Sequence, residues 1–209
     1  YQLKEKFKSL VTSCFEDDKG NIWVSSQSNG ISRINPELKT EVSYEEIFTD
    51  LIINDINIFK GRLFVSTSDG LRIYDIEKDK IFLSQTINEN EYVSKTIQKN
   101  DSTVIIGTMS DGVFSLDINT NLSYHLSIPE DVIVKDVNVD KHQNIYISTI
   151  NEGIIKYDTL GKYHVYNTKN GLGTNSINTS FIDRENNIWL GSYGNGIFKH
   201  SQEIFIYYF

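Results

Sequence analysis

Apolar and polar residues alternate with a period of two along most of this chain. In residues 176–183, for example, Ile177, Thr179 and Phe181 alternate with two serines and an asparagine. A period of two is typical of β-strands, in which successive side chains point to opposite faces of the sheet. The 3.6-residue period of an amphipathic helix is absent. We therefore expect an all-β protein of about 20 short strands.

The strands belong to five similar repeats. Each repeat contains one glycine that ends a turn between two apolar segments, at positions Gly30, Gly70, Gly112, Gly153 and Gly196. The spacings between these glycines are 40, 42, 41 and 43 residues. A period of about 40–45 residues made of short strands is typical of a β-propeller, in which each repeat forms one four-stranded blade. One blade cannot bury both of its faces alone, so neighbouring blades must stack to form the core.

We therefore predict that residues 1–209 form a single β-propeller region of five four-stranded blades. We name the four strands of each blade A to D in chain order. The predicted blades cover residues 9–47, 50–87, 91–128, 132–168 and 174–209. Two arrangements fit this pattern: the five blades form a whole small propeller, or they form a segment of a larger one.

Several repeated residues have structural roles in this interpretation. The glycines supply the positive φ that the B–C turns require. One large residue in each strand B is expected to wedge between blades, at Trp23, Phe64, Ile105, Tyr146 and Trp189. An aspartate six residues before the wedge is expected to form an Asx-turn between strands A and B, at Asp17, Asp140 and Asp183. Cys14 is the only cysteine, so the chain forms no internal disulfide, and we expect this thiol to be buried.

The composition limits the classes of binding partner and of chemistry that we expect for this chain. The chain has 20 Lys and Arg residues against 28 Asp and Glu residues, which gives a net charge of −8. Nucleic acids and anionic membrane surfaces are bound by clustered basic residues, so neither is an expected partner. No segment has the ~18–20 apolar residues of a membrane span, so this part of the protein is not expected to insert into a membrane. The four histidines show no metal-ligand spacing, and neither a metal nor a cofactor is predicted.

The sequence shows no catalytic motif, although it leaves open a carboxylate site assembled from several blades. The B–C turns instead offer a surface, because in propellers these turns share one face with the D–A links. Polar side chains together with an exposed aromatic ring suit a hydroxyl-rich ligand such as an oligosaccharide. The ligand-binding candidates are Tyr193, Asn195, Asp111, Asp69 and Asn151. The alternative interpretation is that these are ordinary solvated turn residues.

The fifth repeat closely resembles the two-component regulator propeller repeat. The pattern of that family has a Gly-Leu pair, an aspartate followed four residues later by Asn-Ile-Trp, and an Asn-Gly turn. The matching residues are 171–172, 175–177, 183, 187–192 and 195–197. The first repeat resembles the same pattern through residues 16–17, 20–24 and 29–31. The second to fourth repeats keep the glycine and lose the tryptophan.

Such repeats occur in the extracytoplasmic sensor regions of bacterial two-component histidine kinases, many of them hybrid regulators of polysaccharide use in Bacteroidetes-type bacteria. The resemblance implies a periplasmic, non-catalytic module that senses an oligosaccharide and is joined to the rest of the sensor kinase chain, an inner-membrane protein. A second copy in a homodimer is a further expected partner. Two alternatives stay open: a propeller enzyme acting on carbohydrate, such as a lyase or a glycoside hydrolase, and a scaffold for protein interaction or dimerisation.

Overall fold

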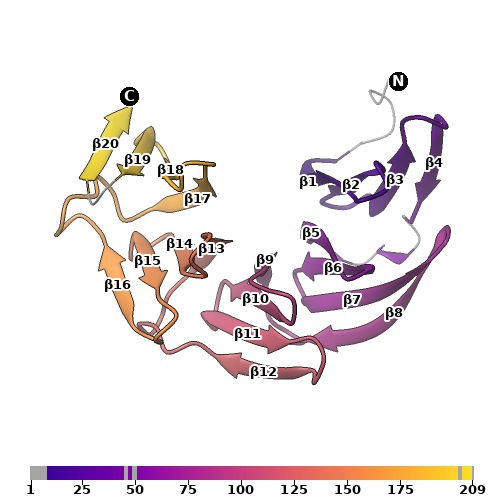
Figure 1. Cartoon of the computed structure of the whole chain (residues 1–209), viewed down its shortest axis with the longest axis horizontal. Coiled ribbons are helices and arrows are strands. Elements are labelled where there is room, and N and C mark those ends of the chain that lie inside the picture. The colour runs from indigo at the N-terminus through magenta and orange to yellow at the C-terminus, as the bar shows by residue number, and fades with distance from the viewer. Residues whose placement is uncertain (1–8, 45–46, 49–50, 202–203, 209) are drawn as a thin grey trace. The chain divides into compact units, whose positions relative to one another are not determined.

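The computed structural model describes residues 9–44, 47–48, 51–201 and 204–208. Within these ranges, 20 β-strands form five antiparallel sheets of four strands each, and no α-helix is present (Figure 1). This arrangement confirms the predicted all-β propeller with five four-stranded blades. The predicted blade limits at residues 50 and 209 lie outside the described residues. The chain divides into two compact units, Tyr1–Thr96 and Ile97–Phe209, which are described separately below.

Unit 1 contains blades 1 and 2, and in each blade the strands pair in chain order. Blade 1 consists of β1 (Val11–Glu16), β2 (Ile22–Ser26), β3 (Ile31–Asn35) and β4 (Thr40–Ser43). Blade 2 consists of β5 (Ile53–Phe59), β6 (Arg62–Thr67), β7 (Gly70–Glu77) and β8 (Lys80–Ile87). Strand A of blade 3 is β9 (Val93–Gln98), which begins in unit 1 and ends in unit 2.

Unit 2 contains the rest of blade 3 and blades 4 and 5. Blade 3 continues with β10 (Thr103–Thr108), β11 (Val113–Asp117) and β12 (Leu122–His125). Blade 4 consists of β13 (Val134–Val139), β14 (Ile145–Thr149), β15 (Ile154–Tyr157) and β16 (Tyr163–Tyr166). Blade 5 consists of β17 (Ile177–Ile182), β18 (Ile188–Ser192), β19 (Ile197–Ser201) and β20 (Ile204–Tyr208). Chain order is again the pairing order.

The core of unit 2 lies between neighbouring blades. Ile105 of blade 3 packs with the buried aliphatic side chains of blade 4, among them Val137 and Ile147. Tyr146 points to the other face of blade 4, where it packs with Leu190 and other apolar residues of blade 5. Each interface therefore combines side chains of two sheets, as expected for blades that cannot form a core alone.

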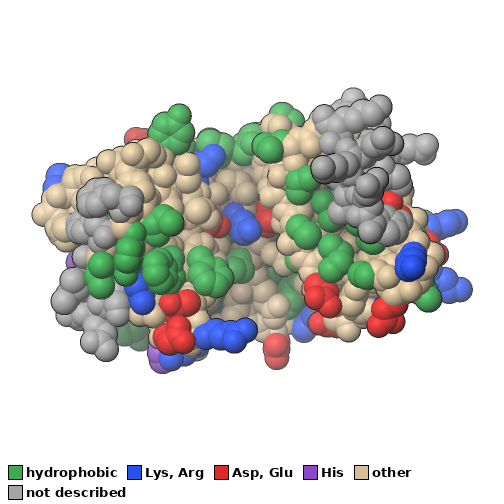
Figure 2. Space-filling model, turned by 90° about the horizontal axis from the view of Figure 1, so that it is seen from above, with side chains coloured by type: hydrophobic (Ala, Val, Ile, Leu, Met, Phe, Trp, Pro, Cys, Tyr) green, Lys and Arg blue, Asp and Glu red, His purple; other side chains and the backbone are tan. Residues whose placement is uncertain are grey.

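The predicted wedge residues are buried in four blades and more exposed in the fifth. Trp23, Phe64, Ile105 and Tyr146 are buried, whereas Trp189 of blade 5 is only half-buried. The face of blade 5 that carries Trp189 also carries exposed apolar side chains, including Phe181 and Ile197. Figure 2 shows hydrophobic side chains gathered at the surface on the side of β17–β20, at the left of that view.

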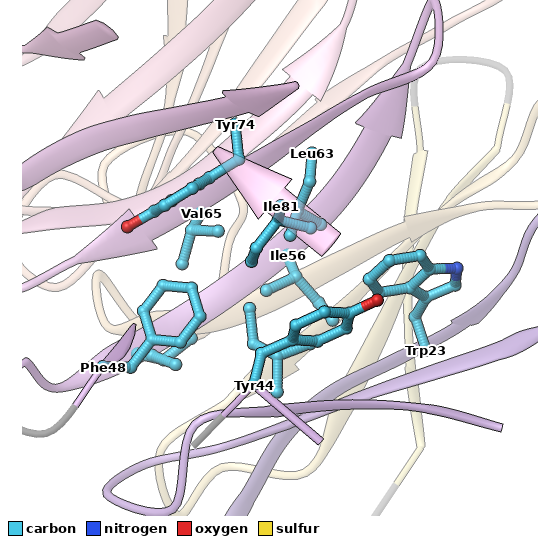
Figure 3. Close-up of a cluster of buried hydrophobic side chains, with 10 residues drawn as sticks. Trp23, Tyr44, Phe48, Ile56, Leu63, Val65, Tyr74 and Ile81 are labelled. Atoms are coloured by element: carbon cyan, nitrogen blue, oxygen red, sulfur yellow. The ribbon is translucent and has the colours of Figure 1, made fainter. Parts of the chain in front are cut away.

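The core of unit 1 is built around the first tryptophan. The Trp23 ring stacks between Phe15 and Tyr44, at ring-centroid distances of 6.4 and 5.9 Å. This layer of blade 1 packs against aliphatic side chains of blade 2, which include Ile56 and Leu63 (Figure 3). Large aromatic and aliphatic side chains thus fill the space between two twisted sheets and remove their apolar surface from water.

The A–B turns explain the spacing of the recognised motif. The Asp17 carboxylate accepts hydrogen bonds from the backbone N–H groups of Lys19 and Asn21, from the Asn21 side chain and from the indole N–H of Trp23 at 2.8 Å. Asp183 accepts the corresponding bonds from Asn187 and Trp189. An aspartate with Asn at the fourth and Trp at the sixth following position therefore forms one closed turn that holds the wedge, as the Asx-turn hypothesis expected.

These hydrogen bonds also set the protonation of the two carboxyls. Partial burial alone would raise the pKa of Asp17, but the hydrogen bonds from Trp23 and Asn21 to its ionised form hold the pKa below its ordinary value. The pKa of Asp183 is lowered to about 2, because the bonds from Trp189 and Asn187 and the charge of Lys199 outweigh desolvation. Both side chains are therefore ionised at neutral pH.

The B–C turns need their glycine and a hydroxyl. In blade 4, Thr149 Oγ1 donates a hydrogen bond to the Gly153 carbonyl oxygen and accepts one from the Glu152 N–H. Gly153 has a φ of 80°, and a Cβ atom there would lie 2.2 Å from the Tyr166 carbonyl oxygen. No other residue fits this position, because an L side chain disfavours the conformation and the end of β16 leaves no space for it.

The prediction that Cys14 is buried is wrong, because its thiol is exposed. Cys14 lies between Ser13 and Phe15 on β1, where successive side chains alternate between the two faces of the sheet. Phe15 packs toward blade 2 in the core of unit 1, so Cys14 points to the opposite face of the strand.

Candidate functional site

In unit 2 the B–C turns and the D–A links lie on one face, which we call the rim. The Asn151 amide in the B–C turn of blade 4 donates to the Asp131 carbonyl oxygen at 2.8 Å and accepts from the Ile133 N–H at 3.2 Å. The Gly153 N–H donates to the Asn175 carbonyl oxygen, which lies in the next link along the chain. Each link is thus fixed by backbone and amide hydrogen bonds to a turn, which gives the rim a defined shape.

A hollow of about 210 Å³ opens at the rim beside blade 3. It lies between the B–C turn that contains Asp111 and the link that contains Glu130 and Asp131. Ile128 and Pro129 contribute its apolar lining. The hollow therefore combines several carboxylates with a small apolar surface, a combination suited to a polar ligand that also has a hydrocarbon face.

His125 stands at the edge of this hollow in a fixed orientation. Its Nε2 lies 2.8 Å from the Asp111 carbonyl oxygen and 3.9 Å from an Asp111 carboxylate oxygen. Its ring contacts Phe114 edge-on at a centroid distance of 4.9 Å. Gly112 leaves the room for this arrangement, because a Cβ atom there would lie 3.3 Å from His125 Nε2.

Asp111 is the predicted site residue whose carboxylate lies at the hollow, where a ligand can reach it. Its side chain is 57% exposed. Its backbone N–H is bonded to Thr108 Oγ1, which holds the turn in place. Asp111 and Asn151 are both connected to the link around Asp131, so the structure brings these two predicted residues to the same part of the rim.

Tyr193 and Asn195 lie in the B–C turn of blade 5, and both are exposed. The Tyr193 side chain is 76% exposed, while its N–H is bonded to the Ser176 carbonyl oxygen of the preceding link. The Asn195 N–H donates to Ser192 Oγ. The backbone of this turn is therefore held, and both side chains are free to meet a ligand from solvent.

Asp69 differs from the other four candidates, because it belongs to unit 1 and its carboxylate already has partners. One oxygen pairs with Arg72 Nη2 at 2.9 Å, and the other accepts the Asn90 N–H at 3.0 Å. These contacts connect the B–C turn of blade 2 with the following link. The geometry therefore gives Asp69 a role in holding this link.

Sequence reasoning missed His125, Glu130 and Asp131 as rim residues. The spacing of the histidines bears only on metal binding, and the two acids lie in a link without a repeated motif. The sequence carries one signal for His125, which lies near the end of the predicted strand D of blade 3 and therefore close to a D–A link.

The described part of the chain contains no group of three or more His, Cys, Asp or Glu side chains placed to hold a metal ion. Nor does it contain a helix with the length and apolar character needed to cross a membrane.

Comparison with known proteins adds three kinds of similarity. The family model described as "Two component regulator propeller" matches residues 171–194. Among curated proteins, Histidine kinase P4 of Formosa agariphila is 27% identical over 187 residues. This match covers 82% of the chain but only 13% of the kinase, so the chain corresponds to a small part of that protein's length.

Solved propellers show the same fold at low sequence identity. The extracellular domain of the putative one component system BT4673 from B. thetaiotaomicron superposes with a TM-score of 0.74 at 17% identity. That match covers 100% of this chain and 36% of the other. Selenomethionine-substituted virginiamycin B lyase from Staphylococcus aureus superposes with a TM-score of 0.77 at 13% identity, over 96% of this chain and 70% of the lyase.

The family match covers the A–B turn around Asp183, the wedge Trp189 and part of the rim turn of blade 5. It therefore coincides with the residues whose hydrogen bonds form that blade. This chain is a β-propeller whose residues 171–194 match the model of the two-component regulator propeller repeat.

Proposed function

We propose that this chain is the extracytoplasmic, ligand-sensing propeller of a two-component histidine kinase system, and that the rim of unit 2 binds an oligosaccharide without converting it. The observation that carries the proposal is the exposed Tyr193 ring on a rim of polar side chains that continues to the hollow at Asp111. The match to the two-component regulator propeller repeat and the similarity to a histidine kinase support the signalling context.

The chemistry of the rim suits a carbohydrate. An aromatic face packs against the C–H groups of a sugar ring, while carboxylates and amides bond to its hydroxyl groups. The hollow of about 210 Å³ is smaller than the roughly 300–1,000 Å³ of a typical drug-sized site, so it suits one ring or one substituent. The remaining sugar units would lie along the open rim, where Tyr193 and Asn195 are exposed.

The location and the partners of the chain are part of the same proposal. The similar B. thetaiotaomicron propeller is described as an extracellular domain, which supports a periplasmic or extracytoplasmic location here. The rest of a sensor kinase chain is the proposed covalent partner, and a second copy in a homodimer is a further one.

Isothermal titration calorimetry of the 209-residue chain tests the proposal with neutral hexasaccharides of glucose, mannose and xylose. We expect one of them to bind. Tyr193→Ala should weaken that binding about fivefold to tenfold, as expected for ~1–1.4 kcal/mol of ring contact. The matched control is Tyr163→Ala, since Tyr163 is a half-exposed tyrosine on β16 and not on the rim. Equal affinities of Tyr193→Ala and wild type would remove Tyr193 from the site.

An enzymatic alternative has one observation in its favour, the His125 ring beside Asp111 at the hollow. A histidine next to a carboxylate is able to transfer protons in acid–base catalysis. Mass spectrometry of the same hexasaccharides after incubation distinguishes the two functions. If the wild type forms cleavage products and His125→Ala does not, the chain is a carbohydrate-cleaving enzyme and the sensor proposal is wrong. If no hexasaccharide binds, the protein-interaction scaffold is favoured.

A further inference from the structure

A second cavity, of about 220 Å³, lies in unit 1 at the strand ends opposite to the B–C turns. It is bounded by the A–B turn of blade 1 and by the A–B and C–D turns of blade 2. No residue of the proposed sugar-binding rim lines it. Its existence and its chemistry are therefore independent of the function proposed above.

Two charged residues of the cavity wall are used by the fold itself. The Arg33 guanidinium lies over the Trp23 ring at 5.6 Å and donates hydrogen bonds to the Lys78 carbonyl oxygen and to Asp79 of blade 2. The Asp17 carboxylate is occupied by Asn21 and Trp23. These contacts hold the cavity wall in place. Because Arg33 and Asp17 already have partners within the fold, neither is expected to be the main partner of a ligand.

Three other charged groups remain at the cavity. Lys19 and Lys78 are exposed cations, and Asp18 is an exposed anion. None of the three forms a salt bridge with a residue that the structure describes. Lys78 is also held in a left-handed backbone conformation, with a φ of 54°, which fixes the direction in which its side chain leaves the C–D turn.

The wall between these charges is apolar. Ile58 and Ile76 line the cavity and pack from behind against the core of unit 1. The cavity thus combines cations, an anion and a hydrocarbon surface within the size of one small organic molecule. A neutral sugar would gain no ion pair from these exposed charges, and a simple anion would be repelled by the carboxylates of Asp17 and Asp18.

We propose that this cavity binds a free α-amino acid with an aliphatic side chain. The α-carboxylate pairs with Lys19 and Lys78, and the α-ammonium pairs with Asp18. The aliphatic side chain packs on Ile58 and Ile76. Such a ligand satisfies both signs of charge at the mouth and removes its apolar part from water.

Four probes test this assignment by calorimetry on the 209-residue chain: leucine, N-acetylleucine, leucinamide and glycine. N-acetylleucine lacks the ammonium, leucinamide lacks the carboxylate, and glycine lacks the aliphatic side chain. We expect leucine to bind and each of the other three to bind at least tenfold more weakly. No heat of binding with leucine would overturn the proposal, and so would equal affinities for leucine and either of its singly charged derivatives.

Substitutions locate the ligand in this cavity. The double variant Lys19→Gln, Lys78→Asn should weaken leucine binding at least tenfold. Asn is chosen at position 78 because it tolerates the left-handed conformation. Asp18→Asn should weaken leucine binding but should not weaken the binding of N-acetylleucine, since that probe has no ammonium group to pair with the carboxylate.

The matched control is Lys39→Asn. Lys39 is an exposed lysine in the C–D turn of blade 1 with a φ of 53°, close to that of Lys78, and it does not line the cavity. It should bind leucine as the wild type does, and thermal unfolding should show all variants folded. Leucine binding that is unchanged in the folded double variant would place the amino acid elsewhere and overturn the proposal.

Discussion

Blade 1 and blade 5 carry the same ladder of side chains across their four strands, but only one of the two ladders is covered. In blade 1 the cross-strand neighbours are Phe15, Trp23, Arg33 and Val42. In blade 5 they are Phe181, Trp189, Lys199 and Ile206. The order is an aromatic residue, a tryptophan, a cation and a β-branched aliphatic residue in both blades.

The surroundings of the two ladders differ strongly. Trp23 is 1% exposed and Ile31 beside it is fully buried, because blade 2 packs on this face. On blade 5, Phe181 is 64% exposed and Ile197 is 49% exposed. The repeat therefore specifies the ladder, whereas burial of the ladder requires the sheet of another blade.

The cations of the two ladders also differ in their contacts with a second sheet. Arg33 lies over Trp23 and also bridges to the C–D turn of blade 2. Lys199 lies 4.9 Å from the centre of the Trp189 ring. A planar guanidinium with several donors serves an interface between two sheets better than an ammonium does.

The largest effect is expected from removing the two tryptophans one at a time. Trp23→Ala should lower the free energy of unfolding by about 3–5 kcal/mol, because it leaves a cavity in a packed interface. Trp189→Ala should cost less than half of that, since its surroundings are half-exposed and already hydrated. Chemical denaturation of both variants measures the difference. Equal losses would show that the blade 5 face is covered in solution.

A smaller effect is expected at the two A–B turns. Asp17→Asn should lower the free energy of unfolding by about 1–2 kcal/mol at pH 7, because it replaces charge-assisted hydrogen bonds around a buried wedge. Asp183→Asn should have a smaller effect, because its turn is more exposed.

The pH dependence of this effect has a definite sign. The folded-state pKa of both carboxyls lies below the unfolded value of about 3.9, so their stabilisation is fully present above about pH 4. It is lost as the pH falls through the folded-state pKa, which is about 2 for Asp183. Urea unfolding at several pH values should therefore show the gap in unfolding free energy between wild type and Asp17→Asn narrowing as the pH falls below about 4. A gap independent of pH would contradict this assignment.

The smallest effect is expected from exchanging the two cations. Arg33→Lys should lower the free energy of unfolding by about 0.5–1 kcal/mol, because the ammonium cannot keep all the contacts of the guanidinium. Lys199→Arg should change it by less than about 0.5 kcal/mol, because Lys199 bridges to no second sheet among the residues that the structure describes. The same denaturation assay measures both variants. A larger effect of Lys199→Arg than of Arg33→Lys would reverse the comparison.

The local structure of each blade could be predicted from the sequence. Alternating residues predicted the strands, and the recurring glycine predicted the B–C turns, since a positive φ is a local requirement that one residue satisfies. The spacing from Asp183 to Trp189 predicted a turn for the same reason, because all of its hydrogen bonds lie within seven residues. Such short-range features depend little on what surrounds the blade.

Which side chains are buried by a neighbouring blade, hydrogen-bonded to other residues or exposed to a ligand became clear from the packing of the sheets. Cys14 is exposed and Trp189 is half-exposed, because the burial of a side chain depends on the adjacent sheet. In the folded protein the Asp69 carboxylate forms a salt bridge with Arg72, whereas the Asp111 carboxylate lies at a hollow beside His125. These outcomes join residues from different strands and links, and a repeat pattern does not contain the distances between them.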